Sequence, residues 1–286
     1  MPILVHTGRE ILPAERATVP ILDHGFLFGD SVYEVVRSAN RRPFLLPEHL
    51  ARLRRSGERV YFDLPWPDAE IARRMAELAE RLPDRELYYR IVATRGPGPI
   101  ALLPEGCDRP GLYVLARELE PYAKRLYVEG CRLAVVPRLR NDPRAMDPAA
   151  KTGNYLNNLL GLVEARRAAA DDALFLNAEG RLTESTTSNV WLVAAGRVLT
   201  PPLSEGLLAG ITRDWLLRRL PEAGVPVEER ALDRASLDGA DEVFLTGTVK
   251  GVMPVSQVDG RRVSSRVPGP VTAKAAALYD EALRLN

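Results

Sequence analysis

Hydrophobic and polar residues alternate along several short stretches of the chain, a period typical of β-strands. Together with flanking turn residues, these stretches predict strands at residues 31–38, 87–94, 111–117 and 132–137. Two other stretches repeat apolar residues every three or four positions and predict helices at residues 47–60 and 67–82. Mixed strands and helices in this order predict an α+β first half.

The apolar periodicity is lost around Pro121, and a linker is therefore expected at residues 119–124. It would separate a small N-terminal domain, residues 1–118, from a larger β-rich C-terminal domain with helices, residues 125–286. Further strands are predicted at residues 173–177, 189–193, 225–229 and 242–246, with helices at 154–170, after Gly210 and at 271–285. In the helix at 154–170, Leu156, Leu159, Leu160 and Val163 are expected to face inward.

Composition excludes several classes of protein. The 39 basic and 38 acidic residues nearly cancel, so neither a nucleic-acid partner nor a membrane partner is expected. We find no apolar run of about 18 residues and no secretory signal pattern, which predicts a cytoplasmic protein. Cys107 and Cys131 form no CxxC pair, and the three histidines are scattered. No metal site is therefore expected.

Only four of the 39 basic residues are lysines: Lys124, Lys151, Lys250 and Lys274. Because arginine stays protonated, nucleophilic amine chemistry must come from one of these four. Lys151 follows a proline-rich loop and precedes a predicted helix, where burial can favour the neutral amine that forms a Schiff base. Lys124 and Lys274 are expected to be exposed to solvent. The role of Lys250, which follows a turn, is left undecided.

Two turns of small residues suit an anion. Gly210, Ile211 and Thr212 open a predicted helix, where free backbone amides bind phosphate, although simple helix capping is an alternative. Thr246 to Val249 follow a strand and form a similar turn. Arg52, off the apolar stripe of its helix, would complete a phosphate clamp. No complete nucleotide-binding loop competes with this interpretation.

A third polar segment, residues 183–189, contains Glu184 among serines and threonines. It is either a solvated turn or the site of a buried carboxylate that pairs with a cationic ring nitrogen. A phosphate clamp, a shielded lysine and such a carboxylate are the parts that pyridoxal phosphate requires.

Ordered motifs carry a resemblance over residues 21–258. They are Asp23-His24-Gly25, Phe28 to Glu34, Glu48 to Leu53, Lys151 to Asn158, Thr183-Glu184 through Val190, Gly210 to Asp214, and Glu242 to Thr248. With them the chain resembles the class IV (fold type IV) pyridoxal-phosphate aminotransferases, which include branched-chain and D-amino acid aminotransferases and aminodeoxychorismate lyases. The resemblance implies a two-domain α+β fold with pyridoxal 5'-phosphate between the domains, and a homodimer.

The resemblance also implies roles for individual residues. Lys151 would bind the cofactor covalently and move the proton at the substrate α-carbon, while Glu184 would keep the pyridine nitrogen protonated. Tyr155 would contact the phenolic oxygen, on the same side as Lys151 if the helix extends back to that lysine. The remaining cofactor residues, for phosphate and ring, would be Arg52, Leu208, Gly210, Ile211, Thr212, Gly247 and Thr248. Gly153 departs from the leucine of many relatives.

The substrate is less sharply defined. The residues expected around it are Tyr33, Tyr88, Arg90, Thr248 and Val249. The motif around Tyr33 resembles the D-amino acid enzymes, but the loop at residues 96–103 lacks their arginine and histidine. Tyr88 and Arg90 resemble the Tyr-x-Arg strand of branched-chain enzymes, so Arg90 would bind the substrate carboxylate unless it forms a structural salt bridge.

The expected activity is ping-pong transamination between an amino acid and a 2-oxo acid, with a slight preference for D-amino acids. The first alternative is an L-branched-chain aminotransferase. Aminodeoxychorismate lyase is the second, although the Gly-Arg-Gly-Tyr pattern common among the lyases is missing from the loop at 96–103. A non-catalytic binding protein on the same fold is the third, and the presence of both Lys151 and Glu184 argues against it.

Overall fold

The computed structural model describes residues 2–264 and 266–286, which form two compact units. The first unit takes the chain up to Glu120, together with Ala150–Asn154 and Asn286. The second unit consists of Pro121–Ala149 and Tyr155–Leu285. Lys151, which the sequence-based division assigns to the C-terminal domain, therefore folds with the first unit. Within the described residues, no helix has both the length and the apolar character needed to cross a membrane.

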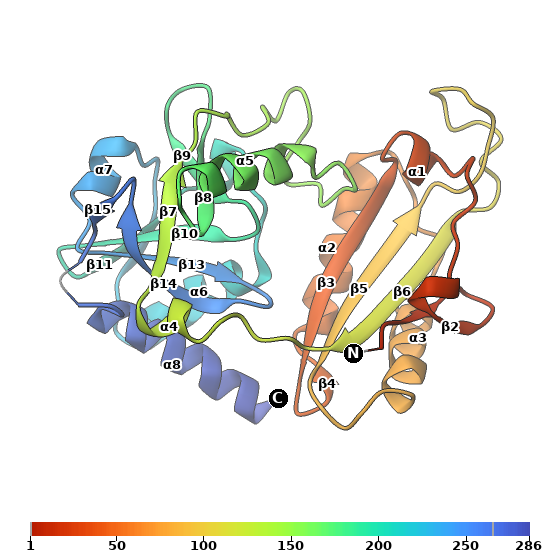
Figure 1. The fold of residues 1–286 in the computed structure, drawn as a ribbon, viewed down its shortest axis with the longest axis horizontal. Coiled ribbons are helices and arrows are strands. Elements are labelled where there is room, and N and C mark those ends of the chain that lie inside the picture. Colours follow the sequence, from red (N-terminus) through yellow and green to blue (C-terminus); the bar gives the residue numbers. More distant parts are fainter. Residues whose placement is uncertain (1, 265) are drawn as a thin grey trace. The chain divides into compact units, whose positions relative to one another are not determined.

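The first unit is built on an antiparallel sheet with the strand order β2-β1-β6-β5-β3-β4 (Figure 1). Its strands are β1 (Leu4–His6), β2 (Ile11–Pro13), β3 (Ser31–Ala39), β4 (Arg42–Pro43), β5 (Leu87–Thr94) and β6 (Gly111–Glu118). The helices α2 (Leu46–Arg59) and α3 (Asp68–Glu80) pack their apolar faces on this sheet. A short helix, α1 (His24–Leu27), precedes β3.

Successive side chains of a strand point to opposite faces of its sheet, and β5 shows the consequence clearly. Leu87, Tyr89 and Ile91 are buried in the core beneath the helices. Tyr88 and Arg90 therefore lie on the other face. In the register between β3 and β5, Tyr33 pairs with Val92, which places Tyr33 on the same face as Arg90.

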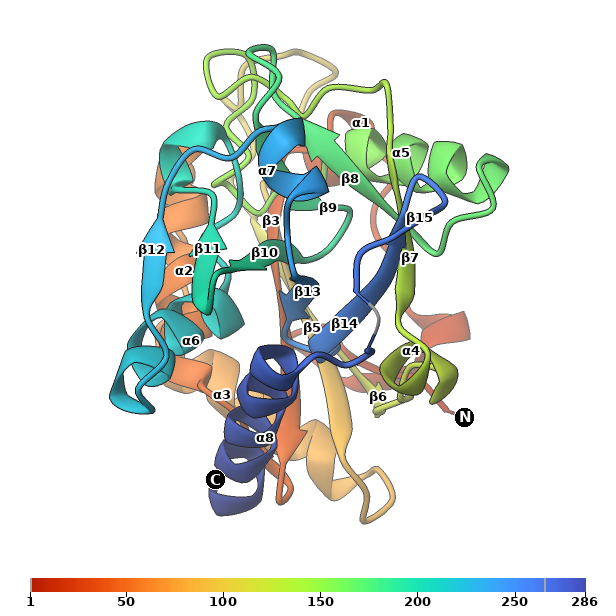
Figure 2. The same cartoon turned by 90° about the vertical axis from the view of Figure 1, so that its left-hand side faces the viewer.

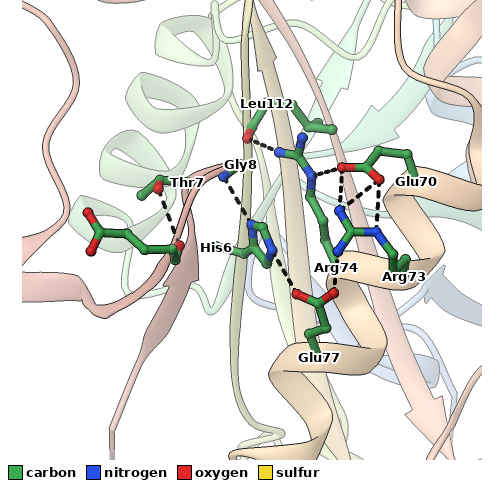
Figure 3. A network of polar contacts seen from close by, with 9 residues as sticks. His6, Thr7, Gly8, Glu70, Arg73, Arg74, Glu77 and Leu112 are labelled. Atoms are coloured by element: carbon green, nitrogen blue, oxygen red, sulfur yellow. Dashed lines mark hydrogen bonds and ion pairs between the residues drawn. The ribbon is translucent and has the colours of Figure 1, made fainter.

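A polar network joins α3 to the sheet in the first unit (Figure 3). His6 on β1 contacts the Glu77 carboxylate at 3.0 Å. Arg74 is buried, and it donates hydrogen bonds to Glu70 at 2.7 Å and to the Leu112 carbonyl oxygen at 2.8 Å. Buried polar groups of this kind are stable only when paired, so the network fixes α3 against β1 and β6.

The second unit contains a nine-stranded sheet in its described part, with the order β12-β11-β10-β13-β14-β7-β8-β9 and β15 beside β14. The strands are β7 (Cys131–Val135), β8 (Asp172–Leu176), β9 (Leu182–Ser185), β10 (Asn189–Ala194), β11 (Arg197–Thr200), β12 (Val227–Glu229), β13 (Glu242–Gly247), β14 (Gly251–Val258) and β15 (Arg261–Arg262). β9 also pairs with β10.

Helices surround this second sheet (Figure 2). They are α4 (Arg125–Val128), α5 (Leu156–Arg167), α6 (Ile211–Glu222), α7 (Arg234–Asp238) and α8 (Pro270–Leu285). The side chains of Trp215 and Tyr279 join α6 to α8 in an edge-to-face contact with ring centroids 5.7 Å apart.

The orientation of α5 differs from the sequence-based expectation. Leu156, Leu159 and Val163 are exposed rather than inward. The buried face is small and contains Gly161, where a Cβ atom would lie 2.2 Å from the Phe175 ring. Close approach of α5 to β8 therefore selects small residues for the inner face, and the larger apolar side chains point outward.

Candidate active site

The main chain of Lys151 is held on the edge of β3. The Tyr33 amide donates to the Lys151 carbonyl oxygen at 2.9 Å, and the Gly153 amide donates to the Ser31 carbonyl oxygen at 2.9 Å. The Lys151 amide in turn donates to the Ser56 hydroxyl at 3.1 Å. Two of these bonds flank an isolated antiparallel bridge between Thr152 and Val32 of β3, and the third ties the lysine segment to α2. They fix the position of Lys151 independently of any helix.

The helical relation expected between Lys151 and Tyr155 is wrong. α5 begins at Leu156, with Tyr155 as the residue that precedes it, so Lys151 lies outside the helix. The presence of glycine at position 153 has a local explanation, because a Cβ atom there would lie 2.3 Å from the Ser31 hydroxyl oxygen. A leucine at this position would require Ser31 to move.

The Lys151 side chain is buried and lies against Tyr33. Its Nζ donates a hydrogen bond to the Tyr33 hydroxyl at 3.3 Å and lies 4.4 Å from the centre of the ring. The Arg90 guanidinium carbon lies 3.9 Å from the centre of the same ring. Across residues 2–264 and 266–286, no carboxylate forms an ion pair with Arg90. Three predicted site residues are thus brought together, and the salt-bridge alternative for Arg90 is not observed. Tyr88, on the same face, instead lies under Arg117 at 5.0 Å.

Arg52 belongs to a buried cluster on the opposite face of β3. Its Nε and Nη2 donate to the two carboxylate oxygens of Glu34 at 2.6 and 2.9 Å. His49 contacts the same carboxylate through Nδ1 at 2.8 Å. His49 and Arg52 lie off the apolar stripe of α2, yet both are buried, because Glu34 supplies a charged partner inside. The paired hydrogen bonds fix the plane of the Arg52 guanidinium.

The same cluster shifts the ionisation of two groups. Burial opposes the charged form of Glu34, but the charge and hydrogen bonds of Arg52, with His49, hold the pKa of Glu34 well below its ordinary value. Burial lowers the pKa of His49, and its hydrogen bond to the Glu34 carboxylate only partly opposes this shift. Glu34 is therefore ionised and His49 neutral near pH 7.

In the second unit, Glu184 is a buried carboxylate rather than part of a solvated turn. Only 4% of the residue is exposed. Arg140 donates from Nε to one carboxylate oxygen at 2.9 Å, and the Leu208 amide donates to the other at 3.2 Å. Arg140 is held in place by Asn157, which accepts a hydrogen bond from Nη1 at 2.9 Å. The carboxylate is thus held at a fixed position.

The helix start that is predicted to bind an anion is the N-terminus of α6. Gly210 precedes the helix, and a Cβ atom there would lie 1.9 Å from the Asn189 amide oxygen, so a larger residue would require the Asn189 side chain to move. No side chain in the described part of the chain caps the first amides of α6. Ile211 and Thr212 are buried at this end. Uncapped amides with a positive dipole end can receive an anion, whereas simple capping is not observed.

The turn between β13 and β14 contains Gly247, Thr248 and Val249 and ends at Lys250. Lys250 is buried, and its Nζ donates to Asp172 at 2.6 Å and to the Ser188 hydroxyl at 2.9 Å. Burial disfavours its charged form, but the Asp172 carboxylate raises the pKa of Lys250 above its ordinary value. A lysine kept protonated in this way is a poor nucleophile, which leaves Lys151 as the candidate for amine chemistry.

Several residues around the site escaped the sequence analysis. Glu34 follows Tyr33 on a predicted strand, so strand alternation alone places it toward the helices and Arg52; this signal was present in the sequence. Arg140 lies in a loop without periodicity, and no sequence signal connects it with Glu184.

Glu34→Gln tests the buried cluster. It removes the negative charge that is paired with buried Arg52, and breaking a buried pair in this way is expected to lower the free energy of unfolding by about 3 kcal/mol at pH 7. Because the folded-state pKa is depressed, the Glu34 contribution is complete above the ordinary carboxyl pKa and is lost as pH falls. Wild type should therefore lose stability more steeply than Glu34→Gln between about pH 5 and pH 2, as measured by urea unfolding. Glu58→Gln, exposed on the same helix, is the control; equal pH slopes for wild type and Glu34→Gln would contradict the prediction.

Comparison with known proteins gives a consistent result. The family model described as "Amino-transferase class IV" matches residues 31–258. A D-alanine aminotransferase from Bacillus licheniformis is 32% identical over 269 residues, which cover 94% of this chain and 93% of the relative.

Two solved structures agree closely with the fold. The branched-chain aminotransferase from Thermoproteus uzoniensis, solved with norvaline, has a TM-score of 0.91 and 31% identity, and the match covers 99% of this chain and 95% of that one. A T.th. branched-chain amino acid aminotransferase, solved with pyridoxamine 5'-phosphate, has a TM-score of 0.92 and 30% identity, with 98% and 94% covered. The match of the family model over most of the chain, with folds this similar, shows that the chain belongs to the class IV aminotransferases, pyridoxal-phosphate-dependent enzymes of fold type IV.

Proposed function

We propose that this aminotransferase exchanges the amino group between L-branched-chain amino acids and 2-oxo acids in a ping-pong reaction. The observation that carries the proposal is the position of Arg90, whose guanidinium lies over the Tyr33 ring that Lys151 also contacts. Guanidinium groups bind carboxylates through paired hydrogen bonds. Since Arg90 forms no ion pair within the described residues, it is available for the α-carboxylate of a substrate beside the reactive amine.

The residues present suit pyridoxal phosphate. A phosphate group needs cations and N–H donors. The first unit offers Arg52 as a cation, and the second unit offers the uncapped amides at Ile211 and Thr212, with Thr248 in its small-residue turn. Gly210 itself adds no side-chain atom beside these amides, and the Asn189 side chain packs against it. When bound, the cofactor supplies an electron-accepting ring for the negative charge that develops at the substrate α-carbon.

Lys151 is the amine that we assign to covalent cofactor binding and to proton transfer at the substrate α-carbon. Its main chain is fixed on β3, and its Nζ is oriented by the Tyr33 hydroxyl at 3.3 Å. A positioned amine transfers a proton efficiently because little reorganisation is needed. Burial of the side chain also limits competition from water.

Glu184 is the carboxylate that we assign to the ring nitrogen. Arg140 and the Leu208 amide each bind one of its oxygens, so the carboxylate keeps its orientation. A buried negative charge beside a ring nitrogen favours the protonated form of that nitrogen. We assign Leu208 to packing against the ring and Tyr155 to the phenolic oxygen.

D-amino acids are the second candidate substrates. Tyr33 lies in a motif that resembles the D-amino acid enzymes, and a D-alanine aminotransferase is among the relatives. The loop at residues 96–103 contains neither arginine nor histidine, however, and these are the residues with which the D-specific enzymes bind the substrate carboxylate. We therefore favour L-amino acids, with Arg90, Tyr88 and the turn at Thr248 and Val249 around the substrate.

We also propose that the enzyme is a homodimer. In the first unit, Ile21, Phe26 and Leu102 expose 69%, 66% and 86% of their surface. The bridge between Asp23 and Pro97 brings the two segments that contain these residues together. Large exposed apolar side chains on neighbouring segments are typical of surfaces that a partner covers.

A panel of half-reactions tests the proposed substrate class. The holoenzyme should react with L-leucine, L-valine and L-glutamate, since Arg90 would bind their α-carboxylates, and the visible absorption band of the bound cofactor should be lost. D-Alanine and D-glutamate should react at least about tenfold more slowly. Faster reaction with the D-isomers would favour the second candidate, and pyruvate release from aminodeoxychorismate without any half-reaction would indicate a lyase.

Borohydride reduction tests the assignment of the amine. The mass of the reduced cofactor should be found on the peptide that contains Lys151, and Lys151→Ala should abolish the label. Lys250 serves as the internal control, because its ion pair with Asp172 keeps it protonated. A label on Lys250 in the wild-type protein would contradict the assignment.

Arg90→Met tests the carboxylate contact. Loss of charge-assisted hydrogen bonds worth about 2 kcal/mol is expected to lower kcat/KM for L-leucine by about 30-fold, mainly through KM. Arg117→Met is the matched control, since Arg117 lies over Tyr88 on the neighbouring strand, and it should change kcat/KM by less than about threefold. Similar losses in both variants would show that Arg90 acts through packing.

A further inference from the structure

We propose that the buried ion pair of Lys250 and Asp172 positions the turn at residues 247–250, so that this turn presents a fixed binding surface to the cofactor phosphate. Lys250 is a positioning residue here, because it acts through the turn that it ends. The inference rests on the proposed function for the role of Thr248 as a phosphate ligand.

The ion pair joins three segments of the second unit. Asp172 is the first residue of β8, whereas Lys250 ends the turn between β13 and β14. Lys250 Nζ also donates to Ser188, directly before β10, at 2.9 Å. The other oxygen of Asp172 accepts a hydrogen bond from Thr186, directly after β9, at 2.5 Å. One carboxylate and one amine thus hold the ends of four strands together.

These segments are the ones that carry predicted cofactor residues. Thr248 lies two residues before Lys250, and Glu184 lies two residues before Thr186. The two turns also touch, because a Cβ atom on Gly247 would lie 3.2 Å from the Thr187 carbonyl oxygen. A displacement of Lys250 would therefore change the position of the turn at residues 247–250 relative to the segment that contains Glu184.

The buried charges of Lys250 and Asp172 favour a single position of the turn. Lys250 and Asp172 are each less than a tenth exposed, and a buried charge without its partner is strongly unfavourable. Each group favours the charged form of the other, so that the pKa of Asp172 is lowered and that of Lys250 raised despite burial. The Lys250 carbonyl oxygen also accepts a hydrogen bond from Tyr127 at 2.8 Å. The turn is thus held at both the side chain and the main chain of one residue.

The test compares two ligands on the full-length protein, pyridoxal 5'-phosphate and pyridoxal, which lacks the phosphate. Dissociation constants are measured by absorbance titration of cofactor-free wild type and Lys250→Met. Displacement of the turn should raise the constant for pyridoxal 5'-phosphate by about tenfold or more. The constant for pyridoxal should change by less than about twofold, because pyridoxal makes no contact with the phosphate turn. Asp172→Asn should give the same pattern, and it replaces Lys250→Met if that variant does not fold.

Glu242→Gln is the matched control. Glu242 is a buried carboxylate at the opposite end of β13, where it accepts hydrogen bonds from the Thr272 amide at 2.8 Å and the Thr272 hydroxyl at 2.7 Å. The Glu242→Gln substitution should lower the melting temperature of the protein without changing the ratio of the two dissociation constants. If Lys250→Met weakens both ligands equally, or matches Glu242→Gln, the ion pair has only a structural role and the inference is overturned. If wild type binds neither ligand, the proposed function itself fails.

Discussion

The two-residue alternation of β3 is the constraint on which the first half of the site depends. Because neighbouring residues of a strand point to opposite faces, Tyr33 meets Lys151 and Arg90 on one face while Glu34 meets Arg52 on the other. A register shift of one residue would exchange the two side chains. It would then bury an aromatic ring among the charges of α2 and place a carboxylate beside the lysine. The apolar residues of β3, Val32 and Val36, prevent this shift, since they are fully buried beneath the helices.

The charged groups of the site follow a second rule, which is that each buried charge has an opposite charge or several donors beside it. Glu34 has Arg52, Glu184 has Arg140, and Asp172 has Lys250. Such pairs cost free energy to desolvate, so they add little net stability compared with apolar packing. Their benefit is orientation, because a carboxylate with both oxygens bound cannot rotate. Each unit thus holds its buried charges in fixed directions, which is the kind of arrangement that electrostatic catalysis requires.

Periodicity and residue chemistry predicted the larger part of the fold. The strand at residues 87–94 agrees with β5 at both ends, and the expected helix at 47–60 agrees with α2 to within one residue. Lys151 and Glu184 could be singled out because few residue types perform their chemistry. The inner face of α5 could not be predicted, since its small residues give no hydrophobic pattern. The contacts of Arg140 and Lys250 could not be predicted either, because long side chains reach partners far away in the sequence.

The short segment of Ala150–Asn154 has a consequence for recombination between members of the family. By sequence the segment lies between two parts of the second unit, but its hydrogen bonds are with the first. A chimera joined near residue 120 would therefore combine the lysine segment of one parent with the β3 edge of the other. A parent with leucine in place of Gly153 would bring that side chain against Ser31, where even a Cβ atom has only 2.3 Å. A chimera that takes residues 150–154 from the same parent as the first unit would keep each lysine segment paired with the β3 strand of its own parent.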